Sequence, residues 1–199
     1  MTRDQGQAEH QRFYWWIDGV GGYLVVPSEK VRIGQPGHDD VEVALLADLQ
    51  PIHAVLHRSE GGTLLHGAGP TRVNGREVTA HLLKDGDRFE LGPVEFQYRQ
   101  PLPWCPTAIL TVRSGHRFPL AVDGIVLLDR LCLLSPSAAA HIRAPWQEKV
   151  LVNWEHDRYW VSSDGSIQID GQQYEGRGPL SPHAQVQADW GSFRWEPLD

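Results

Sequence analysis

Short apolar and alternating segments, separated by Gly, Pro, Asp and Asn, follow one another along the first half of the chain. The clearest is VEFQYR at 94–99, in which apolar and polar side chains alternate. A period of two is typical of a β-strand with one buried face. Comparable segments lie at 14–18, 23–26, 30–33, 41–45, 54–58, 63–66 and 88–91. Because no segment has a sustained helical period between caps, the pattern predicts an all-β sandwich or barrel with little helix.

A proline-rich segment, QPLPWCP at 100–106, interrupts this pattern near the middle of the chain. Three prolines in seven residues favour an extended connector over a paired strand. The segment therefore predicts two domains, at 12–101 and 107–199, joined by a short linker at 102–106.

The second half repeats features of the first half in the same order. VNG at 73–75 is matched by IDG at 169–171, and His53 is matched by His141. The last strand-like segment of each half also matches, as Phe96 and Tyr98 correspond to Phe193 and Trp195. The interval from the histidine to the turn is 8 residues longer in the second half, which predicts a longer hairpin around 153–157. Three ordered matches indicate an internal duplication.

Charge and cysteine content narrow the class of partner and the compartment. The 199 residues include 25 acidic and 18 basic side chains, a net charge of −7, which argues against binding to nucleic acid or an anionic membrane surface. Cys105 and Cys132 fit neither a disulfide framework nor a metal-ligand spacing, which favours a reducing compartment. Since no apolar stretch has the length of a signal peptide or membrane span, we expect a cytoplasmic protein without membrane insertion.

A string of motifs at 31–98 is found in one characteristic order: VRIG at 31–34, Asp40-Val41, His53-Ala54, VNG at 73–75 and LKDGDRFELG at 83–92. These motifs resemble the forkhead-associated (FHA) domain, a β-sandwich of the SMAD/FHA type, over about half the chain. The resemblance implies that loops at one end of the sandwich bind phosphothreonine in a partner protein. The second half keeps only VDG at 122–124, His141 and IDG at 169–171, and is similar to a diverged FHA domain. We therefore expect two tandem FHA-like β-sandwiches.

Three positions depart from the FHA pattern where the family contacts its phosphopeptide. Gln35 replaces the Arg that binds the phosphate, Gln50 replaces a Ser that donates to it, and Gly69 replaces an Asn that holds the ligand backbone. Hydrogen bonds to a charged group contribute ~1.5 to 3 kcal/mol each, so loss of the Arg and Ser donors costs roughly 3 to 6 kcal/mol of binding free energy. We expect the first domain not to bind phosphothreonine in the usual way of the family.

Other residues near these loops have predicted roles. Arg58 and Arg72 are candidate substitute contacts for a phosphate, although solvated charges at strand edges are the simpler interpretation. The resemblance implies that His53 braces the loops without touching the ligand. Asn74-Gly75 has the chemistry of a tight turn, because both residues tolerate positive φ.

The sequence indicates no catalytic, metal or cofactor site. It has no P-loop, HExxH, GxGxxG or nucleophile-elbow motif, and His53 and His57 would stand ~13 Å apart along a strand, too far for one metal ion. Most of the 8 Trp fit the cores of two small sandwiches. Trp104 and Trp146, which lie beside prolines, are the best candidates for exposed aromatic side chains.

We therefore expect a non-catalytic protein-interaction module, a scaffold or adaptor of the kind found in bacterial signalling or secretion assemblies, whose partner is another protein. The first alternative is phosphothreonine-peptide binding through Arg58 or Arg72. The second alternative is carbohydrate binding through exposed Trp side chains.

Overall fold

The computed structural model describes residues 11–119 and 121–198, and all regular secondary structure in these residues is β-strand. The predicted all-β fold is confirmed. No helix in this part of the chain is long and apolar enough to cross a membrane. Residues 1–10, for which the sequence predicts no signal peptide, lie outside the described residues.

The strands form two sheets. The smaller has five strands in the order β4-β3-β5-β6-β9, with bounds Val43–Ala44, Lys30–Gly34, Ala54–Ser59, Gly62–Gly67 and Ala80–Leu83. The larger has 15 strands in the order β15-β14-β16-β17-β19-β20-β1-β2-β13-β12-β11-β10-β7-β8, with β18 beside β17. Its bounds are β1 (Phe13–Ile17), β2 (Gly21–Val26), β7 (Thr71–Val73), β8 (Arg76–Glu77), β10 (Arg88–Leu91), β11 (Val94–Arg99), β12 (Ala108–Val112), β13 (Gly124–Leu127), β14 (Leu131–Ser135), β15 (Ile142–Arg143), β16 (Val150–Glu155), β17 (Arg158–Ile169), β18 (Gln172–Leu180), β19 (Gln185–Ala188) and β20 (Gly191–Pro197).

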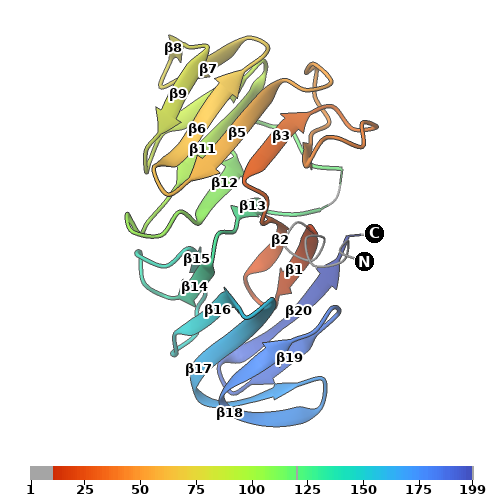
Figure 1. Cartoon of the computed structure of the whole chain (residues 1–199), viewed down its shortest axis with the longest axis vertical. Helices are drawn as coiled ribbons and strands as arrows, with labels where there is room; N and C mark the ends of the chain where they lie inside the picture. Colours follow the sequence, from red (N-terminus) through yellow and green to blue (C-terminus); the bar gives the residue numbers. More distant parts are fainter. Residues whose placement is uncertain (1–10, 120, 199) are drawn as a thin grey trace.

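These strands enclose two hydrophobic cores, one toward each end of the elongated molecule (Figure 1). The first core lies between the five-stranded sheet and strands β7 and β10–β13 of the larger sheet, and we call this part the first sandwich. The second core is enclosed by β14–β20 together with β1, and we call this part the second sandwich. The alternation at 94–99 places Val94, Phe96 and Tyr98 fully inside the first core, because alternate side chains of a strand share one face.

The strand pairing of the first sandwich recurs in the second. Matched pairs lie 96 to 101 positions apart: Ile33↔Ala54 with Leu134↔Val150, Ser59↔Gly62 with Glu155↔Arg158, and Phe89↔Val73 with Val186↔Ile169. The turn residues repeat one hydrogen-bond motif as well. Asn74 N–H donates to Arg88 O while Asn74 Oδ1 accepts Arg88 N–H, and Asp170 makes the same two bonds with Gln185.

Two details of the predicted repeat are wrong. Strand pairing matches His53, directly before β5, to Lys149, directly before β16, whereas His141 precedes β15. The β5–β6 and β16–β17 hairpins have loops of equal length, so no extra residues lie around 153–157. The halves differ earlier, because 19 residues separate β3 from β5 but only 14 separate β14 from β16. A single matched histidine carries no information about strand pairing, which is why it gave the wrong correspondence.

The two cores do not divide at the predicted linker. β1 pairs with β20 and contributes side chains to the second core, whereas β12 pairs with β11 and contributes to the first core. The segment 102–106 is not a strand and contains a turn in which Cys105 N–H donates to Leu102 O. The domain boundaries at 12–101 and 107–199 remain a prediction. Each sandwich contains strands from both sides of the segment 102–106.

Candidate functional site

Three loops meet at one end of the first sandwich, namely 35–42, 45–53 and 68–70. We call these loops, together with the turn at 92–93, the loop end. A Cβ atom at Gly34 would lie 1.9 Å from Pro51 O, so the close approach of the first two loops requires glycine there. Beyond Gly34, Gln35 N–H donates to Gln50 O at 3.3 Å. The structure therefore brings the predicted site positions Gln35 and Gln50 together.

His53 joins the loops through hydrogen bonds and is only 2% exposed. Its Nδ1 accepts Gln50 N–H at 3.2 Å, and its Nε2 lies 3.0 Å from Pro70 O. Because Nδ1 is an acceptor, the ring proton is on Nε2 and is donated to the Pro70 carbonyl. The His53 carbonyl also accepts the N–H groups of Ala68 and Gly69. Both ring nitrogens are therefore used within the fold.

Gly69 lies against the His53 ring and has no room for a side chain. A Cβ atom there would lie 2.6 Å from His53 Cε1 and 2.8 Å from His53 Nε2. The ring cannot move aside without losing its bond to Pro70. A residue larger than glycine at this position would therefore displace the loops.

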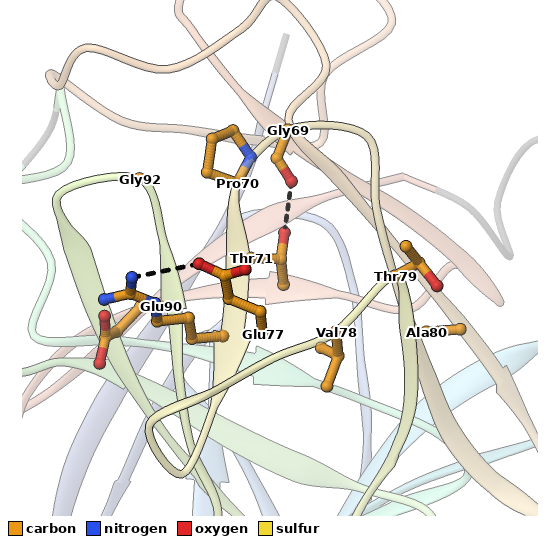
Figure 2. A pocket seen from close by; sticks show the side chains of 10 residues that line it. Gly69, Pro70, Thr71, Glu77, Val78, Thr79, Ala80, Glu90 and Gly92 are labelled. Atoms are coloured by element: carbon orange, nitrogen blue, oxygen red, sulfur yellow. Dashed lines mark hydrogen bonds and ion pairs between the residues drawn. The ribbon is translucent and has the colours of Figure 1, made fainter.

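A cleft of about 900 Å³ lies beside the loop end (Figure 2). Gly69 and Arg72 are among its lining residues, whereas Gln35 and Gln50 are not. The cleft is therefore lined by only some of the predicted site residues. Its charged side chains come from strands β7, β8 and β10.

Arg72 is the cationic side chain of this cleft, and it is already paired. Its Nη2 lies 3.2 Å from Glu77 Oε1, and Figure 2 draws this contact as the dashed line that ends at the labelled Glu77. Its neighbours across the strands are Glu77 in β8 and Glu90 in β10. One cation between two carboxylates leaves the cleft without the net positive charge that a phosphate requires.

The loops nearby are also acidic. Asp39, Asp40 and Asp48 are exposed. Arg32, on the strand that leads into this region, donates from its guanidinium and its backbone N–H to Glu42, and it also lies 3.4 Å from Asp40. Its hydrogen bond to Glu42 raises the pKa of Arg32. Arg32 balances the charge of Glu42, and the exposed Asp39 and Asp48 still make the loop end acidic.

Asn74 and Gly75 form the two-residue turn between β7 and β8, with φ of 50° and 79°. Asn74 Nδ2 donates to Asp87 Oδ1 at 2.8 Å, and Asn74 Oδ1 accepts Arg88 N–H at 3.0 Å. Asp87 also accepts a backbone N–H and lies 3.3 Å from His81 Nε2. Partial burial opposes the charge on Asp87, but these donors outweigh it and lower its pKa. The turn residues tie β7 to β10, and their side-chain atoms are used internally.

Arg58 does not lie at the loop end, so its predicted contact with a phosphate is wrong. It is 7% exposed and lies near the opposite end of β5, beside the β5–β6 hairpin. Its guanidinium donates to Ser28 O at 3.0 Å and to Leu127 O at 3.1 Å. Burial lowers the pKa of Arg58. The side chain links the β2–β3 connection to β13 and is not available to a ligand.

In the second sandwich, His141 is buried in the loop before β15. Its Nδ1 accepts Leu133 N–H at 2.9 Å. Burial, together with the positive charge of Arg99, lowers the pKa of His141 to about 4. Arg99 donates to the carbonyl oxygens of Ala138, Ala140 and His141. The histidine is therefore neutral near pH 7 and contributes to the fold of its loop.

Other chemistries find little support in the geometry. Trp146 is 5% exposed, with its ring centroid 4.6 Å from that of Trp190, so its predicted exposure is wrong. Trp104 is 70% exposed in the linker, and the Trp160 ring is covered by the Arg177 guanidinium 4.4 Å away. One isolated exposed ring is a small platform for a sugar.

Within residues 11–119 and 121–198, no group of three or more His, Cys, Asp and Glu is placed to hold a metal ion.

Arg12 contributes to the loop end but was missed in the sequence. Its Nη1 donates to Val41 O at 3.2 Å and to Glu42 O at 2.8 Å, which fixes the end of the loop after β3. Arg12 lies directly before β1, a strand of the second sandwich. Because this contact is made between distant parts of the chain, no local pattern could have indicated it.

The chain matches no protein-family model and none of the curated proteins. Among solved structures, it is similar to the FHA-2 domain of an ABC transporter from Mycobacterium tuberculosis, determined by NMR, with a TM-score of 0.36 and 29% sequence identity. That match covers 45% of this chain and 79% of the other.

Proposed function

We propose that the chain is a non-catalytic protein-interaction module, a scaffold or adaptor with two FHA-like sandwiches, whose cleft beside the loop end binds another protein without phosphothreonine chemistry. The observation that carries this proposal is the pairing of Arg72 in the cleft with Glu77, and its position opposite Glu90. A phosphothreonine brings nearly two negative charges, and its affinity depends on charge-assisted donors. Carboxylates at these two positions oppose such a ligand.

The magnitudes favour an unmodified partner segment. An exposed pair such as Arg72–Glu77 contributes ~0 to 1 kcal/mol, so a ligand could separate it at little cost. A phosphate in the cleft would then lie near two carboxylates, and like charges ~6 Å apart repel by roughly 1 to 3 kcal/mol at effective dielectric constants between that of water and a protein surface. This repulsion cancels the ~1.5 to 3 kcal/mol that one charged hydrogen bond contributes. A neutral or basic segment avoids the repulsion.

The motif string at 31–92 and the recurring strand pairs support an FHA-type module of two related sandwiches. The volume of the cleft supports binding of a short segment, because ligand pockets in proteins span ~300 to 1,000 Å³. His53 and Asn74 support the same interpretation, since their side chains hold the loops and leave recognition to the cleft surface.

Site-specific photocrosslinking tests this proposal in the cells that make the protein. A benzoylphenylalanine at Thr79, which is exposed in the cleft, is compared with one at Glu60, which is exposed at the hairpin tip of the opposite end. We expect Thr79 to capture a discrete partner polypeptide and Glu60 not to do so. When a lysate of these cells is treated with phosphatase before irradiation, the Thr79 product should be unchanged. Equal products from both positions, or loss of the product after dephosphorylation, would contradict the proposal.

A further inference from the structure

The first and last strands of the two halves pair crosswise. β1, the first strand of the chain, pairs with β20, the last. β12, the first strand after the linker, pairs with β11, the last strand before it. Both pairings have the same register: Trp15↔Trp195 and Ile17↔Phe193 in one, and Leu110↔Tyr98 and Val112↔Phe96 in the other. Each half therefore supplies the strand that completes the sheet of the other half.

The hydrophobic cores follow this exchange. β1 contributes three buried side chains to the second core: Phe13, Trp15 and Ile17. β12 and β13 contribute four to the first core: Ala108, Leu110, Ile125 and Leu127. Between the sandwiches β2 and β13 pair in parallel, and β2 places Val25 in the second core and Val26 in the first. Withdrawal of the β1–β2 hairpin would expose the second core to water. Withdrawal of the β12–β13 hairpin would expose the first core.

The exchange also reaches the loops. Arg12, beside β1, donates to the carbonyl oxygens of Val41 and Glu42 in the loop between β3 and β4. Arg99, at the end of β11, donates to three carbonyl oxygens at 138–141 in the loop between β14 and β15. These loops correspond in the repeat, because each connects the matched parallel strand pairs β3·β4 and β14·β15. Each sandwich thus receives an arginine from the other.

We infer that the exchange of the β1–β2 and β12–β13 hairpins makes the two sandwiches one obligate folding unit, with the loop end held by contacts from both sandwiches. Tandem domains joined by a linker ordinarily have separate cores and can fold alone. Here the core of each sandwich is completed by strands from the other side of the linker.

The tryptophans provide a natural probe of this coupling. The first core contains no tryptophan. The second core contains all the buried tryptophans, which are Trp15, Trp146, Trp190 and Trp195. Tryptophan fluorescence therefore reports on the second sandwich, whereas far-UV circular dichroism reports on both. Phe89 is fully buried in the first core, and its counterpart Val186 is fully buried in the second.

The test is urea unfolding of the full-length Phe89→Ala variant, followed by both signals, with Val186→Ala as the matched control. One folding unit predicts a single transition, in which both variants shift the fluorescence and circular dichroism midpoints downward together. A fluorescence midpoint unchanged by Phe89→Ala, with a separate earlier transition in circular dichroism, would overturn the inference. If Phe89→Ala does not fold, Phe89→Leu replaces it in the same comparison. A Phe89→Ala protein that has lost the circular dichroism of the first sandwich but keeps native tryptophan fluorescence would also overturn the inference.

Engineered thiol pairs test the exchange in the full chain. Trp16 faces Arg194 across β1 and β20, and Thr111 faces Gln97 across β12 and β11. Directly opposed strand residues are ~4.5 to 5.5 Å apart at Cα, within reach of a disulfide. We expect Trp16→Cys with Arg194→Cys, and Thr111→Cys with Gln97→Cys, to crosslink within one chain. Trp16→Cys with Gln97→Cys, the pair expected without exchange, should stay reduced. Crosslinking of that pair alone, or crosslinks only between chains, would overturn the inference.

Discussion

The loop end of the first sandwich and its counterpart in the second show how one pattern of strand pairing gives two different surfaces. β6 ends at Gly67 and β7 begins at Thr71, so the residues between them form part of the cleft rim. In the second sandwich β17 runs without a break over Arg158–Ile169, and the matching positions form an irregularity between Ser162 and Ser166 in its ladder with β18. Strand pairing sets the frame, and the short connections decide whether that frame carries a site.

The largest expected difference in stability is between a variant of His53 and a variant of its matching residue in the second sandwich. His53 joins the loops, whereas the matching position in the second sandwich is the exposed Lys149. We expect His53→Ala to lower the free energy of unfolding by about 3 to 5 kcal/mol, because it leaves a cavity and unpairs Gln50 N–H and Pro70 O. Lys149→Ala should change it by less than about 0.5 kcal/mol. Chemical denaturation measures both, and similar losses in the two variants would show that His53 is not a brace.

Acid should destabilise the whole protein through His141 in the second sandwich. Its folded pKa of about 4 lies below its ordinary 6.5, so the unfolded chain binds more protons between these values. Stability therefore rises with pH across this window and is lost as pH falls from 6.5 to 4. A difference of this size corresponds to about 3 kcal/mol. Unfolding free energies measured between pH 4 and 7 should show this slope, and His141→Gln should flatten it. An equal slope in both proteins would show that groups other than His141 cause the loss of stability at low pH.

A glycine pair sharpens the same comparison with a smaller effect. A Cβ atom at Gly69 would meet the buried His53 ring at 2.6 Å, whereas at the matching Gly165 it would lie 3.4 Å from the flexible end of Glu148. We expect Gly69→Ala to destabilise the protein by about 1 to 3 kcal/mol, because the loops must shift. Gly165→Ala should be close to neutral. Thermal unfolding midpoints compare the two, and a neutral Gly69→Ala would mean that the ring has room to move.

The smallest expected effect concerns Asp87, whose matching position in the second sandwich is Ala184. Donors from Asn74, a backbone N–H and His81 lower the folded pKa of Asp87 below its ordinary 3.8. The stability it contributes is present above pH 3.8 and is lost as pH falls through its folded pKa. Asp87→Asn should therefore reduce stability near neutral pH and weaken the dependence below 3.8. Denaturation at pH 3 and pH 7 would test this, and an unaltered difference between the two pH values would refute it.

The strands and turns could be predicted from the sequence, because their causes are local. The alternation at 94–99 follows from burial of one face of β11, and Asn74 and Asp170 both have the positive φ that their turn chemistry favours. The place of Arg58, away from the loop end, could also be predicted. At ~3.3 Å per residue, five positions along a strand place it roughly 16 Å from His53, at the other end of the sheet.

The hairpin exchange could not be predicted in this way. β1 and β12 are both short apolar strands, and no local signal states which of two matched last strands each will join. Residues 12 and 99 carry arginines whose partners lie in loops more than twenty positions away, so their contacts depend on the completed fold. Long-range pairing, and the contacts that follow from it, are what the pattern of the sequence leaves open.

Calorimetric titration of the full-length protein with a degenerate phosphothreonine peptide library, and with the same library unphosphorylated, tests phosphate-independent recognition most directly. Because Arg72 is paired with Glu77 and lies opposite Glu90, the two libraries should give the same heat at low and at physiological salt. Binding that requires the phosphate, weakens with added salt and disappears in Arg72→Ala would contradict the proposed function.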